Sequence, residues 1–195
     1  MRRGKLIAFE GIDGSGKTTI STRAYQAAKN KGAQVLYTFE PTYSKVGSII
    51  HLVLSGDIEA SGEFQALMFA ADRVNHFQTE IEPELNAGRN VLVDRYIHSS
   101  IAYQGVLLND EEWVRTINRS VPVPDLAIYI DIDPKTGLRR RGRRSIYEKL
   151  DLLGEIRAAY KKMVARGELV QVDGSKSEDM VFDQVWKLVV DELRL

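Results

Sequence analysis

The sequence has no cysteine, no net charge and no long hydrophobic run, and each absence excludes a class of protein. Without cysteine there is no disulfide, no thiolate zinc site and no cysteine nucleophile. The 27 Lys and Arg residues balance 27 Asp and Glu residues, so the chain lacks the basic surplus of a nucleic-acid-binding protein, and small molecules are its expected partners. No window has the apolar length of a membrane span, and the first residues lead into a strand rather than a signal-peptide core. We therefore expect a cytoplasmic protein with no nucleic-acid and no membrane partner.

Length and hydrophobic pattern predict one α/β domain over residues 1–195. Short apolar, β-branched runs alternate with longer helical patterns, and they lie at residues 6–9, 34–38, 91–93, 126–132 and 169–172. This alternation predicts a doubly wound, five-stranded parallel sheet flanked by helices on both faces. Ligands of such sheets bind at the carboxyl ends of the strands. The loops expected there begin at Gly11, Glu40, Asp94, Asp133 and Asp173.

The first of these loops has the sequence of a triphosphate-binding loop, which makes the predicted fold that of a P-loop NTPase. It reads Gly11-Ile12-Asp13-Gly14-Ser15-Gly16-Lys17-Thr18, and all eight residues are predicted to bind the nucleotide cofactor. The glycines let backbone N–H groups point at phosphate oxygens, Lys17 adds a cation, and the Thr18 hydroxyl is a magnesium ligand. A helix is expected from Thr18 to Lys31, and its N-terminal dipole favours the same anion.

A second candidate position is Asp94-Arg95-Tyr96, at the end of the third apolar run. After a strand of a phosphate-loop protein, Asp94 is expected near the metal and its water shell, and Arg95 can bind a phosphate through its forked guanidinium. The alternative is that Asp94 caps the next helix and pairs with Arg95.

The segment 64–76 has helical periodicity with two distinct faces. Phe64, Leu67, Met68 and Ala71 recur at helical spacing and predict the stripe that faces the core. Phe69, Arg73 and His76 share roughly the opposite face, where an aromatic ring beside an arginine could stack on a base and hydrogen-bond its edge. A second packed face or a surface cation–π pair explains the same pattern equally well.

An arginine-rich stretch follows the fourth apolar run, with arginines at 139, 140, 141, 143 and 144. A solvated helix end, a nucleic-acid patch and a lid over transferring phosphates are the three interpretations. Overall neutrality disfavours the nucleic-acid patch, whereas phosphoryl transfer needs cations that arrive on closure.

Together these segments resemble the thymidylate kinases, which transfer the γ-phosphoryl group of ATP to dTMP. The resemblance rests on residues 9–19, Glu40-Pro41, residues 69–73, Asp94-Arg95-Tyr96, residues 99–105 and the arginine-rich stretch. It implies ATP and Mg²⁺ as cofactors, with Thr18 and Asp94 toward the metal. It also implies that Phe69 stacks on thymine, Arg73 bonds its O4, Asp13 meets the deoxyribose 3′-hydroxyl and Arg95 holds the acceptor phosphate. Tyr103 and Gln104 would line the base and sugar pocket, Tyr103 would exclude a 2′-hydroxyl, and Ser99 is a further residue of the substrate site.

Members of this family place a catalytic arginine either in the phosphate loop or in the lid. Positions 14 and 15 here are Gly and Ser, so the resemblance implies a lid arginine, as in the bacterial type. Arg143 is the first candidate because Gly142 frees its backbone, followed by Arg139 and Arg144, in a lid at about 139–148. Many bacterial members carry an arginine before Glu-Pro, where this chain has Phe39, and Lys45 is the candidate replacement.

The resemblance also implies a homodimer, for which the helical region 64–85 and the segment after Asp94 are the candidate surfaces. Two other functions stay open at this point. One is a related kinase with another nucleotide or deoxynucleoside as acceptor. The other is a GTPase-like switch, whose Asn-Lys-x-Asp signature is approached only by Asn30-Lys31-Gly32-Ala33, which lacks the Asp.

Overall fold

The computed structural model describes residues 3–140, 146–147 and 149–195. Its centre is a five-stranded sheet in which every neighbouring pair of strands is parallel, in the order β2-β3-β1-β4-β5. The strands are β1 (Leu6–Glu10), β2 (Val35–Phe39), β3 (Asn90–Asp94), β4 (Leu126–Asp131) and β5 (Val170–Asp173). Each overlaps one predicted apolar run, so the predicted parallel α/β sheet is confirmed.

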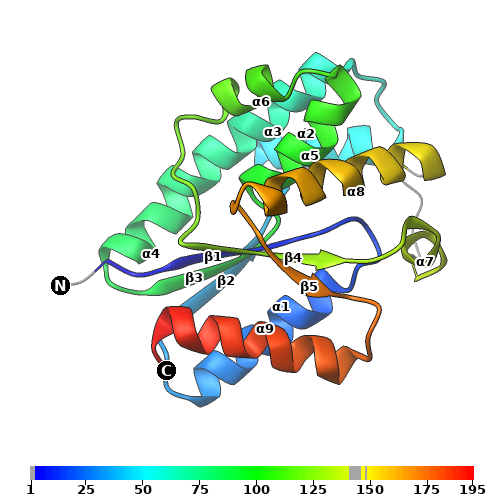
Figure 1. Cartoon of the computed structure of the whole chain (residues 1–195). Helices are drawn as coiled ribbons and strands as arrows, with labels where there is room; N and C mark the ends of the chain where they lie inside the picture. Colours follow the sequence, from blue (N-terminus) through cyan, green and yellow to red (C-terminus); the bar gives the residue numbers. More distant parts are fainter. Residues whose placement is uncertain (1–2, 141–145, 148) are drawn as a thin grey trace.

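Helices cover both faces of the sheet (Figure 1). One face is covered by α1 (Lys17–Asn30) and α9 (Glu178–Leu193). The opposite side and the carboxyl edge carry α2 (Lys45–Ser55), α3 (Gly62–His76), the π-helical turn η1 (Phe77–Ile81), α4 (Glu82–Asn86), α5 (Ile97–Leu108), α6 (Glu111–Ile117), α7 (Pro134–Arg140) and α8 (Leu150–Ala165).

The side chains of the central strand β1 point alternately to the two faces of the sheet, and the core accordingly has two layers. Leu6 and Ala8 of β1 belong to the cluster beneath α5 and α8, whereas Ile7 and Phe9 belong to the cluster beneath α1 and α9. Successive side chains of a strand point to opposite faces, so a central strand must be apolar throughout. All five residues of β1 are buried, including Glu10 at its carboxyl end.

The structure corrects the predicted core stripe of α3. Phe64 and Leu67 are 44% and 50% exposed, Ala71 is also exposed, and Met68 is only half-buried. The buried face instead carries Gln65, Ala66, Ala70, Asp72, Arg73 and His76. Helical periodicity identifies an apolar stripe but does not show whether that stripe faces the core or the solvent. Here the polar residues of α3 face the interior, because buried hydrogen-bond partners there satisfy them.

In the described part of the chain, no helix is long and apolar enough to cross a membrane.

Candidate active site

The loop between β1 and α1 has the geometry of an anion cradle. Gly14 and Gly16 adopt φ angles of 77° and 88°, which side chains disfavour. α1 begins directly after Gly16, and no side chain in the described ranges caps it there, so its first N–H groups are available to an anion. Residues 11–18, called the phosphate loop below, therefore form a site suited to phosphates.

A buried cation and a hydroxyl–carboxylate pair lie where α1 begins and β3 ends. Lys17 is 7% exposed, and burial together with the positive charge of Arg95 lowers the pKa of Lys17 to about 8. The Thr18 hydroxyl donates a hydrogen bond to Oδ2 of Asp94, the last residue of β3. The other oxygen of Asp94 is buried and has no hydrogen-bond partner among the described residues. A hydroxyl beside a carboxylate with a free oxygen fits Mg²⁺, which prefers hard oxygen ligands and retains water.

Beside the phosphate loop lies a cavity of about 110 Å³, the central cavity. It is lined by Asp13, Glu40, Pro41, Leu54, Phe69, Arg73, Arg95, Ser99, Ser100, Tyr103, Gln104 and Tyr147. Seven of the eight residues predicted to bind substrate are therefore found together here. The eighth, Lys45, begins α2, is exposed and does not line the cavity, so its predicted role stays a prediction.

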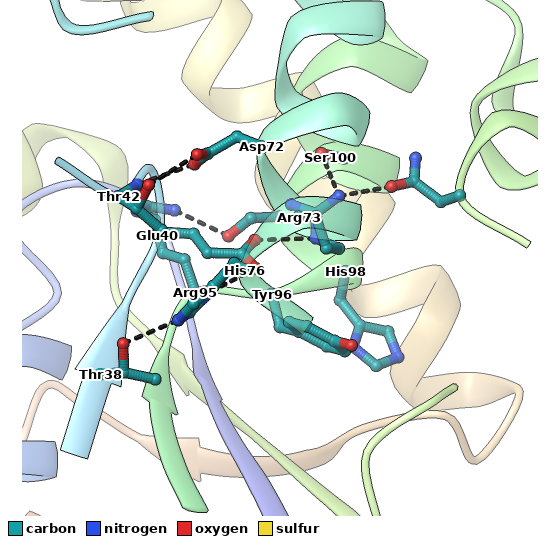
Figure 2. Close-up of polar contacts among 12 residues, drawn as sticks. Thr38, Glu40, Thr42, Asp72, Arg73, His76, Arg95, Tyr96, His98 and Ser100 are labelled. Carbon is teal, nitrogen blue, oxygen red and sulfur yellow. Dashed lines mark hydrogen bonds and ion pairs between the residues drawn. The ribbon is translucent and has the colours of Figure 1, made fainter. Parts of the chain in front are cut away.

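Arg73, which lines the central cavity, is held by polar contacts to neighbouring side chains, which Figure 2 shows. Its Nε donates to Glu40 at 2.7 Å, and its Nη1 donates to Ser100 Oγ at 3.0 Å and to Asn118 Oδ1 at 2.5 Å. Its side chain is 1% exposed, and its Nη2 makes no hydrogen bond to any described residue. A buried guanidinium with one nitrogen left over is well placed to donate to a ligand.

Arg95 joins the central cavity to the phosphate loop. Its guanidinium pairs with Asp13 of the loop and donates to Ser99 Oγ at 2.9 Å. It also lies 5.1 Å from the ring centroid of Tyr103, whose hydroxyl accepts the Asp13 N–H at 3.2 Å. These contacts bring three predicted substrate residues and the predicted phosphate cation into one cluster.

The far wall of the cavity comes from Tyr147, which is 4% exposed. Its hydroxyl donates to Gln65 at 2.5 Å and accepts from Gln104 Nε2 at 3.2 Å. Its ring meets the Tyr103 ring edge-on, with centroids 5.2 Å apart. Tyr147 thereby ties the segment after the arginine-rich stretch to α3 and α5.

The predicted lid arginines are only partly described. Arg139 and Arg140 end α7, where Arg139 donates to Thr136 and Arg140 Nη1 donates to the Gly174 carbonyl at 3.4 Å. Arg140 also lines a second hollow of about 410 Å³ on the other side of the phosphate loop, together with Gly14, Gly16, Thr19, Ile20, Gly174, Lys176, Glu178 and Val181. Arg143 and Arg144 lie outside the described residues.

Sequence reasoning assigned no role to several residues that build this site. Glu40 accepts from Arg73 and also lies 3.1 Å from His76 Nδ1. Its position at the carboxyl end of β2 is a signal that could have found it. Asn118 and Tyr147 carry no comparable signal, because their contacts join residues that are 45 and 82 positions apart.

Known proteins share this chain's sequence and fold. The family model for thymidylate kinase matches residues 9–185. The chain belongs to the thymidylate kinase family. A probable thymidylate kinase of Staphylothermus marinus is 39% identical over 194 residues, covering 97% of this chain and 96% of that protein. One of Methanocaldococcus jannaschii is 41% identical over 171 residues, covering 88% and 87%.

The fold likeness extends to a solved structure of a thymidylate kinase. The structure of the Candida albicans enzyme superposes with a TM-score of 0.85 at 24% identity, over 97% of this chain and 92% of that one. This thymidylate kinase family member is therefore a nucleoside monophosphate kinase built on the P-loop NTPase fold, and its family implies ATP as the phosphoryl donor.

Proposed function

We propose that this protein transfers the γ-phosphoryl group of ATP to dTMP, giving dTDP and ADP. The observation that carries the proposal is the central cavity, which is lined by Phe69 and Arg73 and shares Asp13 with the phosphate loop. A base-sized cavity that opens at a triphosphate loop places an acceptor nucleotide next to the donor. Positioning and charge neutralisation supply most of the rate enhancement of phosphoryl transfer, so this adjacency is the requirement that matters most.

In this proposal the acceptor is held by groups of complementary chemistry. Phe69 stacks on thymine, and the unpaired Nη2 of Arg73 donates to its O4. Arg95 holds the acceptor phosphate, Asp13 meets the 3′-hydroxyl, Ser99 lines the cavity beside Arg95, and Tyr103 and Gln104 complete the sugar and base walls. Burial raises the pKa of Tyr103 to about 12, so its hydroxyl stays neutral beside the sugar.

The donor would lie along the phosphate loop, with Lys17 at its phosphates and the adenosine toward the hollow lined by Arg140 and Lys176. Thr18 and Asp94 are the residues that would hold Mg²⁺, which neutralises phosphate charge when bound. The free Asp94 oxygen supports this assignment.

We propose that a lid at about 139–148, closing over one domain that spans residues 1–195, supplies the catalytic arginine, as in the bacterial type. Arg143 is the first candidate, with Arg139 and Arg144 after it. The phosphate loop of this chain carries no arginine. An arginine at position 14 would clash with α7, because a Cβ there would lie 2.2 Å from the Gly137 carbonyl oxygen. A longer side chain there would require α7 to move.

A cytoplasmic homodimer completes the proposal. Its surface would be the exposed face of α3, where Phe64, Leu67 and Ala71 lie beside a shallow hollow that also includes Val74 and Ile117. Large apolar side chains grouped on one exposed face are typical of a protein interface.

The test is an acceptor panel: initial rates with Mg²⁺-ATP and each nucleoside monophosphate or deoxynucleoside. We expect kcat/KM for dTMP to exceed that for dCMP and AMP by at least about a hundredfold, because unpaired buried hydrogen-bonding groups penalise the wrong base edge. Preference for dCMP, AMP or a deoxynucleoside would show a related kinase with another acceptor. A preference for GTP with no acceptor phosphorylated would show a nucleotide-dependent switch.

A further inference from the structure

Glu10 is a buried acid that the proposed reaction does not use. It ends β1, immediately before the phosphate loop, and its side chain is fully buried. A carboxylate in such a place requires hydrogen-bond donors around it, and it has three. The Tyr96 N–H donates to Oε1 at 2.9 Å, and the hydroxyls of Ser99 and Tyr160 lie 2.6 Å and 3.2 Å from Oε2.

One of these three donors, the Tyr96 N–H, directly follows Arg95, whose backbone is strained. Arg95 has a φ of 68°, a left-handed conformation that side chains disfavour. Its own N–H donates to the Phe9 carbonyl at 2.9 Å, and the next N–H in the chain, that of Tyr96, donates to Glu10. The last two residues of β1 therefore accept hydrogen bonds from the peptide N–H groups on both sides of the Arg95 Cα.

The third link runs through the Ser99 hydroxyl. Ser99 Oγ lies 2.6 Å from Glu10 Oε2 and 2.9 Å from Arg95 Nη1. A serine hydroxyl has one proton, and an ionised carboxylate can only accept. When Glu10 is ionised, above its pKa of about 7, the Ser99 proton must therefore point at Glu10, which leaves the lone pairs of Ser99 facing the guanidinium.

We propose that Glu10 is a positioning residue, which holds Arg95 ready for the acceptor phosphate by fixing the peptide after it and by orienting the Ser99 hydroxyl toward its guanidinium. This inference rests on the proposed function, in which Arg95 binds that phosphate. An amide at position 10 would donate an N–H group to Ser99 Oγ. The hydroxyl would then rotate, and its lone pair would no longer be available to accept from Arg95.

The charges around Glu10 are consistent with this role. Burial raises the pKa of Glu10 to about 7, while the Ser99 hydrogen bond and the charge of Arg95 act in the opposite direction. Burial lowers the pKa of His98, 3.9 Å away, to about 3, so that ring stays neutral and adds no competing cation. The titratable and charged groups facing Glu10 come from α1, α3, the segment 94–98 and α8: Lys17, Arg73, Arg95, Tyr96, His98 and Tyr160.

The experiment compares two ligands that differ only in the phosphate. The affinity of dTMP is measured by calorimetry, and that of thymidine by competition, for the wild type and for Glu10→Gln. We expect Glu10→Gln to weaken dTMP by about tenfold or more, the effect of one hydrogen bond to a charged group, and to leave thymidine within about twofold. Ser99→Ala leaves the buried acid in place and should likewise weaken dTMP but not thymidine. If Glu10→Gln does not fold, Ser99→Ala provides the test.

The matched control is Asp125→Asn, at the opposite end of β1. Asp125 also accepts a strand N–H, that of Leu6 at 2.9 Å, but it has no contact with Arg95. Its replacement should leave both affinities unchanged. If Glu10→Gln weakened dTMP and thymidine equally, the proposal would be overturned, because Glu10 would then support the fold in general. Unchanged affinity for both ligands would overturn it as well.

Arg95→Lys separates this inference from the proposed function. If that variant binds dTMP as the wild type does, the assignment of Arg95 to the phosphate is wrong. If it weakens dTMP selectively while Glu10→Gln and Ser99→Ala do not, only the role of Glu10 is wrong. In the Arg95→Lys background, Glu10→Gln should weaken dTMP binding by less than about twofold further, because both substitutions disrupt the same Glu10–Ser99–Arg95 hydrogen-bond network.

Discussion

Lys17 carries its positive charge where burial disfavours it. Burial and the charge of Arg95 lower its pKa to about 8 in the ligand-free protein. The charged form is the one that binds a triphosphate, so affinity for ATP should fall as the pH rises through 8.

That prediction is checked by titrating ATP without acceptor between pH 7 and 9.5. Lys17→Met should bind ATP more weakly and without this decline. An affinity that stays constant across the range in the wild type would contradict the lowered pKa.

Glu10 is a second buried group whose charged form is disfavoured, and here the consequence is for stability. Its pKa is about 7 in the fold against 4.5 for an ordinary glutamate, so between these values the folded state holds a proton that the unfolded state has lost. The contribution of Glu10 to the free energy of unfolding should therefore fall by about 3 kcal/mol as the pH rises from 4.5 through 7.

Glu10→Gln has no proton to lose at this position. In denaturant unfolding at pH 5 and pH 8, the free energy of unfolding of the variant relative to that of the wild type should be larger at pH 8. The dTMP binding of the variant should nevertheless be weaker. Parallel pH dependences of the two proteins would contradict the raised pKa. A residue that lowers stability when ionised but supports binding is expected at a functional site.

At the scale of elements, two glycines let α7 approach the phosphate loop. A Cβ at Gly137 would lie 2.7 Å from the Asp13 carbonyl oxygen, so Gly137→Ala must push α7 and the loop apart. We expect an increase of about tenfold in KM for ATP, since small displacements of positioning groups are costly.

Gly154→Ala in α8 is the control, because a Cβ there meets nothing within 4 Å. Replacing glycine inside a helix should stabilise the protein by about 0.5–1 kcal/mol and leave the KM for ATP unchanged. If both variants keep the wild-type KM, the contact between α7 and the phosphate loop has no part in donor binding.

The exposed stripe of α3 makes the proposed dimer testable. Leu67→Glu places a charge on the 50% exposed apolar face and should convert a dimer to a monomer in size-exclusion chromatography with light scattering. Met180→Glu, on the equally exposed surface of α9 at 52%, should leave the mass unchanged. A wild type that elutes as a monomer contradicts the proposed dimer.

The same helix shows the limit of sequence reasoning about elements. The position of α3 and the sharing of one face by Arg73 and His76 were predictable from a period of 3.6 residues. Which face is buried was not, because Asp72 and Arg73 enter the interior only through partners such as Thr42 and Glu40, which are 30 and 33 positions away. Local pattern cannot report such long-range pairing.

For the whole molecule, the parallel sheet was predictable because each strand is an apolar run bounded by loops, and its chemistry gathers at the carboxyl ends for topological reasons. The phosphate loop was predictable because its chemistry is contained in eight consecutive residues. The acceptor side was accessible only through resemblance, since its cavity is assembled from the loops after β1, β2 and β3, from α2, α3 and α5, and from Tyr147.

The central claim, phosphoryl transfer from ATP to dTMP across these two neighbouring sites, is tested most directly by following the label of γ-³²P-ATP. With dTMP and Mg²⁺, the wild type should transfer the label to dTDP, and Lys17→Ala should lose roughly a hundredfold or more in turnover while keeping its affinity for dTMP. Label that appears only as inorganic phosphate, or Lys17→Ala turnover close to that of the wild type, would contradict the account.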